Sequence, residues 1–345
     1  MNKNFLKELL QTHSPSGMEN EGVKCFLGYL NGDNIDKIGN GIVKYGNGTH
    51  SLLLSGHIDE ISLRVQNIDD KGFIYFIKNG GADPKVMLGA TITILNKNGK
   101  VKGIIGKAPI HVESAEERKS IDIKKMKIDI GVTNKNDALK LVDIGDTIII
   151  DGNFMELTEH RFVSRGLDDK LGVFIVAEVL KRLKENADNN FKHLKNLTVY
   201  GSACTQEETG GSGAVNLGKI NPEISIDYDV HFASDDGFVS ANEFGDVSLG
   251  KGGAICHSVD CNHNLVSLIK NVCEENQIPY QSFSKGCGGT NTVKIKNSAF
   301  NCETALLSIP LRNMHTQVEM ADYNDIESLI MMTLATIYKI DEMLS

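Results

Sequence analysis

Side chains that bind metals follow several apolar, strand-like segments of this 345-residue chain. Each segment leads to imidazole or carboxylate groups, and one further acidic pair precedes an apolar helix. In open α/β sheets ligands bind beyond the carboxyl ends of the strands, so these groups would meet at one edge of a sheet. Imidazoles and carboxylates gathered there suit a hydrolytic site of the zinc type. The segments and their ligands are residues 51–56 with His57 and Asp59, 197–203 with Glu207 and Glu208, 224–226 with Asp227 and Asp229, 305–310 with His315, and the pair Asp168–Asp169 before 171–183.

Each motif taken alone also has a purely structural interpretation. An acidic pair before a helix, such as Asp168–Asp169, most often caps the helix or faces its dipole. The pair Glu207–Glu208 would usually be a solvated turn, and His57 an ordinary strand-end histidine. Solvated turns do not place ligand-type residues after nearly every core strand, so the coincidence favours a metal site. Cys256 and Cys261, with two nearby histidines, lack a common zinc spacing and do not indicate a second metal site.

Composition and charge argue against other classes of protein. Apolar residues make up 41% of the chain, which supports a buried core, and a net charge of −9 with both signs interspersed offers no basic surface for nucleic acid. No apolar run approaches the ~18 residues of a membrane-spanning helix, so we expect no membrane partner. Residues 1–10 predict an amphipathic helix rather than a signal peptide. Seven scattered cysteines without a Cys-x-x-Cys pair favour free thiols, and we therefore expect a cytoplasmic protein.

The pattern of elements changes twice along the chain. Residues 1–65 alternate helix and strand, and Ser16 with Glu19 matches a capping box that would open a helix. Residues 66–158 are mostly short β-forming segments, with a hairpin turn at 96–99. Beyond 160 strands and helices alternate again. The strands expected in the middle section cover 73–78, 86–95, 101–107, 126–131 and 147–151, and the later helices are expected near 171–186, 264–276 and 322–344.

This order of elements predicts an α/β fold, in which a mixed, largely parallel sheet with helices on both faces is interrupted by a small β-rich domain. The catalytic domain would comprise residues 1–65 and 159–345, and the inserted domain residues 66–158.

Five motifs, in the right order, resemble the M42 family of dinuclear metallo-aminopeptidases, which includes the tetrahedral and glutamyl aminopeptidases. The similarity runs almost from end to end of the chain. It implies a zinc-exopeptidase-like fold with a barrel or PDZ-like insertion. The motifs are residues 56–61, similar to His-x-Asp-Glu-Ile; 167–172, similar to Leu-Asp-Asp-Arg-x-Gly; 205–214, similar to Gln-Glu-Glu-x-Gly followed by Gly-Ala; 229–230, at the place of Asp-Val-Thr; and 309–319, similar to Ile-Pro-x-Arg-x-x-His-Ser-x-Val-Glu.

The resemblance also implies a role for each candidate residue. Asp168 would bridge two divalent metal ions. His57 and Asp229 would complete one metal site, and Glu208 and His315 the other. Glu207 would be the general base, and Asp59 would hold the His57 imidazole in the tautomer that binds metal.

The implied activity is removal of N-terminal residues from short peptides. Two metal ions would hold a bridging water as hydroxide and polarise the peptide carbonyl, with zinc expected first and cobalt or manganese as alternatives. The inserted domain would serve oligomerisation, because members of the family assemble from dimers into dodecameric shells. We therefore expect a homododecamer that acts on short peptides.

Departures from the family pattern bear on specificity. Asn291 stands where the family commonly has Asp, Lys170 stands where Arg is usual, and Gly211-Ser212 replaces bulkier residues. Asp227 and Asp235 compete with Asp229 for the ligand role. The alternative functions are a dinuclear hydrolase on another substrate, such as a deacylase or, less favoured, a glucanase, and a catalytically silent peptide-binding scaffold.

Overall fold

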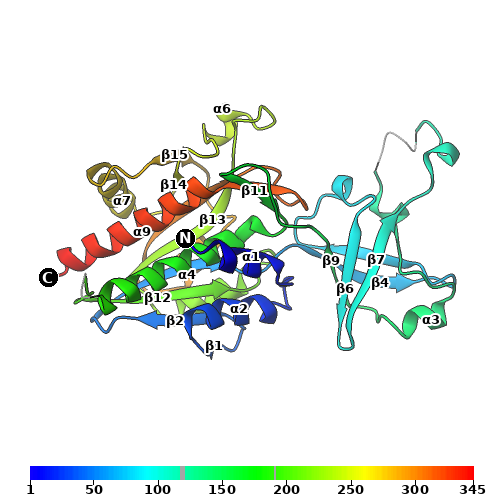
Figure 1. The fold of residues 1–345 in the computed structure, drawn as a ribbon, viewed down its shortest axis with the longest axis horizontal. Coiled ribbons are helices and arrows are strands. Elements are labelled where there is room, and N and C mark those ends of the chain that lie inside the picture. Colours follow the sequence, from blue (N-terminus) through cyan, green and yellow to red (C-terminus); the bar gives the residue numbers. More distant parts are fainter. Residues whose placement is uncertain (117–120, 190–191) are drawn as a thin grey trace.

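The computed structural model describes residues 1–116, 121–189 and 192–345 and has two lobes (Figure 1). The larger lobe is built on an eight-stranded sheet and holds both termini. The smaller lobe is a closed six-stranded barrel inserted between two parts of the larger one. The α/β fold with an inserted β-rich domain, predicted from the sequence, is therefore confirmed.

The main sheet has a parallel centre of four strands in the order β12, β3, β13 and β16. The pairs β2–β12 and β14–β16 at its sides are antiparallel. Side chains of β3 alternate between the two faces, because Leu52 and Leu54 join the main core while Leu53 joins a smaller cluster on the opposite side. In spatial order the strands are β1 (Asn34–Ile35), β2 (Gly41–Tyr45), β12 (Leu197–Cys204), β3 (His50–His57), β13 (Ile224–Phe232), β16 (Glu303–Leu311), β14 (Gly253–His257) and β15 (Tyr280–Ser284).

Helices cover both faces of this sheet. The central helix, α4 (Leu167–Asp188), is buried over most of its length because it packs across β3, β12 and β13. The main core also receives α1 (Lys3–Gln11), α2 (Asn20–Leu30), α7 (His263–Glu275) and α9 (Tyr323–Met343), whereas α5 (Ser212–Gly218) and α8 (Asn291–Ser298) cover the opposite face and α6 (Ala241–Phe244) is peripheral. Among the described residues, none of the helices has the length and apolar character needed to span a membrane.

The barrel has its own core, which includes Leu63, Ile74 and Ile92. Its strands run from Ser62 to Ile150. They begin slightly before residue 66, the predicted start of the inserted domain, and end before residue 158, its predicted end. The predicted turn at 96–99 is confirmed, because Asn96 pairs with Gly99. In barrel order the strands are β4 (Ser62–Ile68), β5 (Ile74–Asn79), β8 (Lys127–Asp129), β7 (Gly99–Gly106), β6 (Thr91–Asn96) and β9 (Thr147–Ile150), joined by the short helices η1 (Pro84–Val86), η2 (Ile110–Val112), η4 (Ile123–Lys125) and α3 (Lys135–Leu139).

A three-stranded sheet joins the chain leaving the barrel to the end of the catalytic domain. It consists of β10 (Met155–Glu156), β11 (Arg161–Ser164) and β17 (Glu319–Asp322). Residues 155–158, which we assigned to the inserted domain, therefore include a strand of this sheet rather than of the barrel.

Two expected strands have different bounds in the structure, and one expected helix cap is absent. The strand expected at 86–95 begins only at Thr91, because Pro84–Val86 form a 3-10 turn and Gly89 has a left-handed φ of +81°. The strand expected at 224–226 continues as β13 to Phe232, because pairing with β16 persists after pairing with β3 ends at Asp227. Ser16 and Glu19 form no capping box: Glu19 is the N-cap of α2 without a side-chain cap bond.

Candidate metal centre

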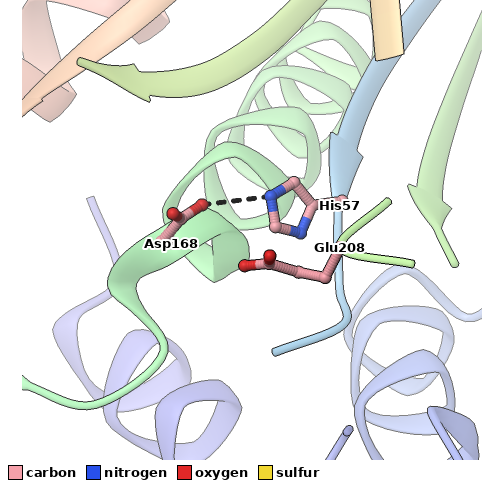
Figure 2. Close-up of side chains that lie close together, drawn as sticks. All are labelled: His57, Asp168 and Glu208. Atoms are coloured by element: carbon pink, nitrogen blue, oxygen red, sulfur yellow. Dashed lines mark hydrogen bonds and ion pairs between the residues drawn. The ribbon is translucent and has the colours of Figure 1, made fainter. Parts of the chain in front are cut away.

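Three ligand-type side chains meet at the carboxyl end of the parallel strands. Ligand atoms of His57, Asp168 and Glu208 all lie within 4.8 Å of one another. Figure 2 shows the imidazole at the end of β3 and the two carboxylates pointing into the same space. His57 is the last residue of β3, Asp168 lies at the start of α4, and Glu208 follows β12. The predicted edge of the sheet is thus where these groups come together.

The two oxygens of Asp168 face two different imidazoles. Nε2 of His57 lies 3.0 Å from Oδ1 of Asp168, and Nε2 of His315 lies 3.2 Å from Oδ2. The same His315 nitrogen is 3.5 Å from Oε1 of Glu208. Asp168 therefore occupies the middle of the centre, between one imidazole from the sheet and one from the loop after β16.

Main-chain carbonyls orient both imidazoles. Nδ1 of His57 is 3.0 Å from the carbonyl oxygen of Asp59, and Nδ1 of His315 is 3.1 Å from that of Gly81. A carbonyl oxygen only accepts, so each Nδ1 carries a proton, and in the neutral imidazole the lone pair is on Nε2. The nitrogen that faces Asp168 is therefore, in both cases, the one free to bind a metal ion.

The two aspartates at the start of α4 have different roles. Asp168 and Asp169 have non-helical backbone angles, so the regular helix begins after them. Oδ1 of Asp169 accepts from the N–H of Gly172 at 3.0 Å and Oδ2 from that of His57 at 3.1 Å. Asp169 therefore has the structural capping role that we considered for the pair, and Asp168 is left to face the imidazoles.

Asp59 positions the turn that carries the two glutamates. Its Oδ1 accepts from the N–H of Glu207 at 2.9 Å, and its Oδ2 from that of Glu208 at 3.1 Å. The Ser16 hydroxyl donates to the same Oδ2 at 2.6 Å. The Asp59 carboxylate is 3.6 Å from Nδ1 of His57, so the contact at hydrogen-bond distance comes from its carbonyl group instead. The tautomer of His57 thus depends on the main chain of residue 59, and its carboxylate orients Glu207 and Glu208.

The structure separates the three competing aspartates. Asp235 forms an ion pair with Arg312, with Oδ2 2.6 Å from Nη2. Asp227 is fully buried and accepts from the Ser225 hydroxyl at 3.1 Å. Asp229 lies two residues beyond the Asp227–Ser55 strand pair, just as His57 lies two residues beyond Ser55 on the neighbouring strand. The charges of Asp168 and His57 act on the carboxyl group of Asp229, so this aspartate lies beside the centre.

Burial and mutual charge raise the pKa values of several side chains in the centre. Burial, and next the charge of Asp168, raise the pKa of Glu208 to about 8 and that of Asp229 well above its ordinary value. Burial also raises the pKa of Glu207. Burial alone would lower the pKa of His57, but its contact with Asp168 raises it well above the ordinary value, and contact with Asp168 raises that of His315 to about 10.

This charge pattern fits bound metal ions. Carboxylates outnumber imidazoles, and buried like charges repel unless a proton or cation lies between them. A carboxylate oxygen and the lone pair of a neutral imidazole, about 3 Å apart, likewise attract each other only through a shared proton or cation. The donor set of imidazole nitrogen and carboxylate oxygen is one that zinc and related divalent ions accept.

Two contributors were missed in the sequence. Glu319 is 2% exposed; its Oε1 accepts from the N–H of His315 at 2.8 Å, and its Oε2 from that of Leu167 at 2.7 Å. It therefore ties the two loops of the centre together, and its place in the motif at 309–319 was the available signal. Gly81, from the barrel, had no signal of this kind.

A pocket opens beside the centre, between the catalytic domain and the barrel. Ligand-type side chains of the centre line it together with aliphatic side chains and other polar groups. The centre contributes Asp168, Glu208 and His315, and the aliphatic residues are Ile61, Ala82, Val86, Ile149 and Ile150.

Two departures noted in the sequence are buried and are not part of the ligand cluster. Lys170 is fully buried, and its ammonium donates to Oε1 of Glu60 at 3.0 Å and to the carbonyl of Thr12 at 2.8 Å. Arg165 forms a second ion pair with Glu60. Asn291 is buried at the first turn of α8, and its side-chain amide has no hydrogen-bond partner in the described part of the chain.

Fold and centre together define an α/β metal-dependent hydrolase with an inserted barrel. The family model of the M42 glutamyl aminopeptidases matches residues 39–332, and the chain belongs to this family. It is accordingly a metal-dependent aminopeptidase.

Individual relatives agree over nearly the whole chain. It is 29% identical to a lysyl aminopeptidase of Pyrococcus furiosus over 351 positions, which cover 98% of this chain and 97% of that one. A TET aminopeptidase from a marine-sediment Thaumarchaeota archaeon superposes with a TM-score of 0.91 at 29% identity, covering 99% and 98% of the two chains. The Pyrococcus horikoshii TET1 peptidase, which can assemble into a tetrahedron or a large octahedral shell, superposes with a TM-score of 0.85 at 30% identity, covering 96% and 98%.

Proposed function

We propose that this protein removes N-terminal residues from short peptides with a centre of two divalent metal ions. His57 and Asp229 would hold one ion, Glu208 and His315 the other, and Asp168 would bridge them. The observation that carries the proposal is that each oxygen of Asp168 faces the Nε2 of a different imidazole. Zinc is the ion we expect first, with cobalt and manganese as alternatives that the same ligands accept.

The chemistry then depends on proton transfer by Glu207. When bound, the two ions supply Lewis-acid polarisation of the peptide carbonyl and lower the pKa of the attacking water. Glu207 accepts the proton of that water as it attacks the carbonyl carbon, and delivers the proton to the leaving amine when the C–N bond breaks. Asp59 accepts from the N–H of Glu207 and so holds the main chain that carries this carboxylate. Burial, which raises the pKa of Glu207, brings it closer to the pH at which it must both take and give a proton.

The substrate would lie in the pocket between the centre and the barrel. Its aliphatic residues, which include Ile61, Val86 and Ile150, would contact a side chain of the peptide, and its carboxylates would contact the free amino group. Attraction of an ammonium group to excess carboxylate favours cleavage at the N-terminus over cleavage within a chain.

Replacing Glu207 by Gln tests the base directly. The amide keeps the shape of the side chain but accepts no proton, so turnover should fall by at least ~10²-fold while metal content stays unchanged. Glu243→Gln, the same change on the exposed helix α6, is the control and should behave like the native protein. Near-native turnover by metal-loaded Glu207→Gln would contradict the assignment.

Assays of the native protein with aminoacyl, N-acyl amino acid and glycan substrates, each with zinc, cobalt or manganese, would separate the aminopeptidase from the alternative hydrolases.

We also propose that the chain forms a closed shell of twelve subunits built from dimers. Rotational symmetry of a tetrahedron generates twelve equivalent positions, and the P. horikoshii relative can assemble into a tetrahedron. The barrel exposes apolar side chains that a neighbouring subunit would cover: Ile77, Ile104 and Ile144 are 45%, 52% and 57% exposed. A shell would admit short peptides and exclude folded proteins.

Light scattering on the metal-loaded protein at micromolar concentration tests the shell. We expect a mass near twelve times that of the 37.7 kDa chain. Ile104→Lys, which puts a charge on the barrel surface, should shift the protein to smaller species, whereas Lys97→Glu on the β6–β7 turn should not. A native protein that remains monomeric would rule the shell out.

All seven cysteines are free, in keeping with the cytoplasmic location that we propose.

A further inference from the structure

A loop of the barrel reaches the metal centre. Residues 80–83 connect β5 to η1, and the carbonyl oxygen of Gly81 lies 3.1 Å from Nδ1 of His315, 234 positions away in the chain. This contact fixes the proton on Nδ1 and turns Nε2 toward Asp168, 3.2 Å away, and Glu208, 3.5 Å away. The orientation of one candidate ligand is therefore set by a different domain from the one that carries it.

The loop is anchored to the barrel. Ala82, next to Gly81, is 2% exposed and belongs to the barrel core together with Met87. Asp83 caps η1, because its Oδ1 accepts from the N–H of Lys85 at 2.9 Å. The Gly81 carbonyl therefore projects from a segment anchored on both sides, and it can act as a fixed support for the imidazole.

The loop also approaches the centre too closely for a side chain. A Cβ atom on Gly81 would lie 2.7 Å from both Nδ1 and Cε1 of His315, well below a normal contact distance. The φ of Gly81 is outside the left-handed region, so the backbone itself would accept alanine. A side chain at position 81 would therefore displace the His315 imidazole, although the backbone conformation would allow one.

A second contact joins the barrel to the catalytic-domain loop that carries His315. The side-chain amide of Gln317 donates to the carbonyl of Val86, in η1, at 3.0 Å. His315 itself has a φ of +62°, a conformation that costs a non-glycine residue energy and persists only where its surroundings hold it. The barrel supplies part of those surroundings.

We infer that the inserted barrel positions His315 for metal binding through the Gly81 carbonyl, so that the second metal site is complete only when the barrel is docked against the catalytic domain. The inference rests on the proposed function, in which His315 is a metal ligand. Any movement of the barrel relative to the catalytic domain would then change metal affinity at this site, while the site built around His57 would be unaffected.

The test compares Gly81→Ala with Gly106→Ala. Both glycines lie in the barrel domain and neither has a left-handed φ, but a Cβ on Gly106 would meet nothing within 4 Å. Titration of the metal-free proteins with Co²⁺, followed by visible absorption, and metal content after dialysis would report the two sites separately. We expect Gly81→Ala to bind one ion normally and the second about 10- to 100-fold more weakly, the usual cost of losing a group that orients a ligand. Gly106→Ala should match the native protein at both sites.

Native affinity for both ions in Gly81→Ala would overturn the inference. If Gly81→Ala does not fold, Gln317→Ala decides instead, because it removes a contact to the barrel without adding bulk. That variant should weaken the second ion by a few fold and leave the first unchanged, and unchanged affinity at both sites would again overturn the inference. A native protein that binds no second ion would contradict the two-metal function itself, so the two failures are distinguishable.

Discussion

The two imidazoles of the centre are supported in different ways. His57 ends a central strand of the sheet and is 2% exposed, and both its Nδ1 and its N–H are bound by groups of the same domain, Asp59 and Asp169. The side chain of His315 is 30% exposed in a loop with a left-handed backbone, and its Nδ1 is bound by Gly81 of the barrel. One ligand is positioned by the core of its own domain and the other by a contact between two domains.

This difference divides the centre into a rigid and an adjustable half. The position of His57 can change only if the sheet is disturbed, because its neighbours belong to the main core. The position of His315 depends on how the barrel sits, and contacts between domains are generally weaker than a core. Asp168 lies between the halves and faces both.

The change with the largest expected effect removes this shared element. Asp168→Asn keeps the size of the side chain but removes the charge that would hold two cations, so both halves lose affinity. We expect loss of metal and a fall in turnover on the order of 10³-fold or more, with the fold retained. Metal analysis and circular dichroism would check both points.

Asp227→Asn is the matched control. Asp227 is a buried aspartate on β13, the strand next to β3, and its carboxylate accepts from Ser225 instead of facing an imidazole. It should keep both ions. Full metal content in Asp168→Asn would instead favour a purely structural role for Asp168.

The next comparison sets the two histidines against each other. We expect His57→Ala and His315→Ala each to weaken one ion and to lower turnover by roughly 10²-fold. Free imidazole should restore part of the activity of His315→Ala, because that position is 30% exposed, but not of His57→Ala, where solvent has little access. Rescue measured against imidazole concentration would show the difference, and equal rescue of both variants would argue against a rigid half and an adjustable half.

The prediction with the smallest expected effect on catalysis concerns Glu60, and the quantity that it changes is the stability of the fold. Burial alone would raise the pKa of Glu60, but Arg165 and then Lys170 outweigh it and lower the pKa from 4.5 to about 2. A carboxyl whose pKa is lower in the folded state stabilises the protein above its ordinary pKa, and this stability is lost as the pH falls through the folded value. Stability should therefore decrease between about pH 4.5 and pH 2.

Glu60→Gln should remove this component of the acid sensitivity. It leaves Arg165 and Lys170 without their carboxylate, and we expect it to lower the free energy of unfolding at pH 7 by about 3–5 kcal/mol. Denaturation at fixed protein concentration, for the native protein, this variant and Glu243→Gln as the surface control, would check the prediction. An unchanged acid midpoint in Glu60→Gln would contradict it.

Much of the fold could be predicted from local patterns. Apolar runs predicted the central strands, and the alternation of β and α segments predicted the sheet with an insertion. The errors fell where long-range pairing overrides local preference, as at β13, which continues through Asp227 and Asp229 because β16 pairs with it along its whole length. The strand expected at 86–95 failed because its first residues belong to a 3-10 turn.

The candidate ligands themselves were named from residue types and motif order. The sequence pattern does not show which of two adjacent residues faces the centre and which has a structural role. Asp168 and Asp169 are equivalent as letters, yet one faces two imidazoles and the other caps α4, because the backbone turns between them. Ser16 likewise matched a capping box but donates to Asp59 instead.

The sequence by itself determined the chemistry of this protein: which strands exist, which carboxylates and imidazoles follow them, and hence that a metal-dependent hydrolase was to be expected. Only the tertiary structure decided how those groups are aimed. The tautomers depend on two main-chain carbonyl groups, and every residue carries such a carbonyl, so no residue type marks the ones that matter. The Gly81 carbonyl reaches His315 only because the barrel, folded on its own core, docks beside the end of the sheet.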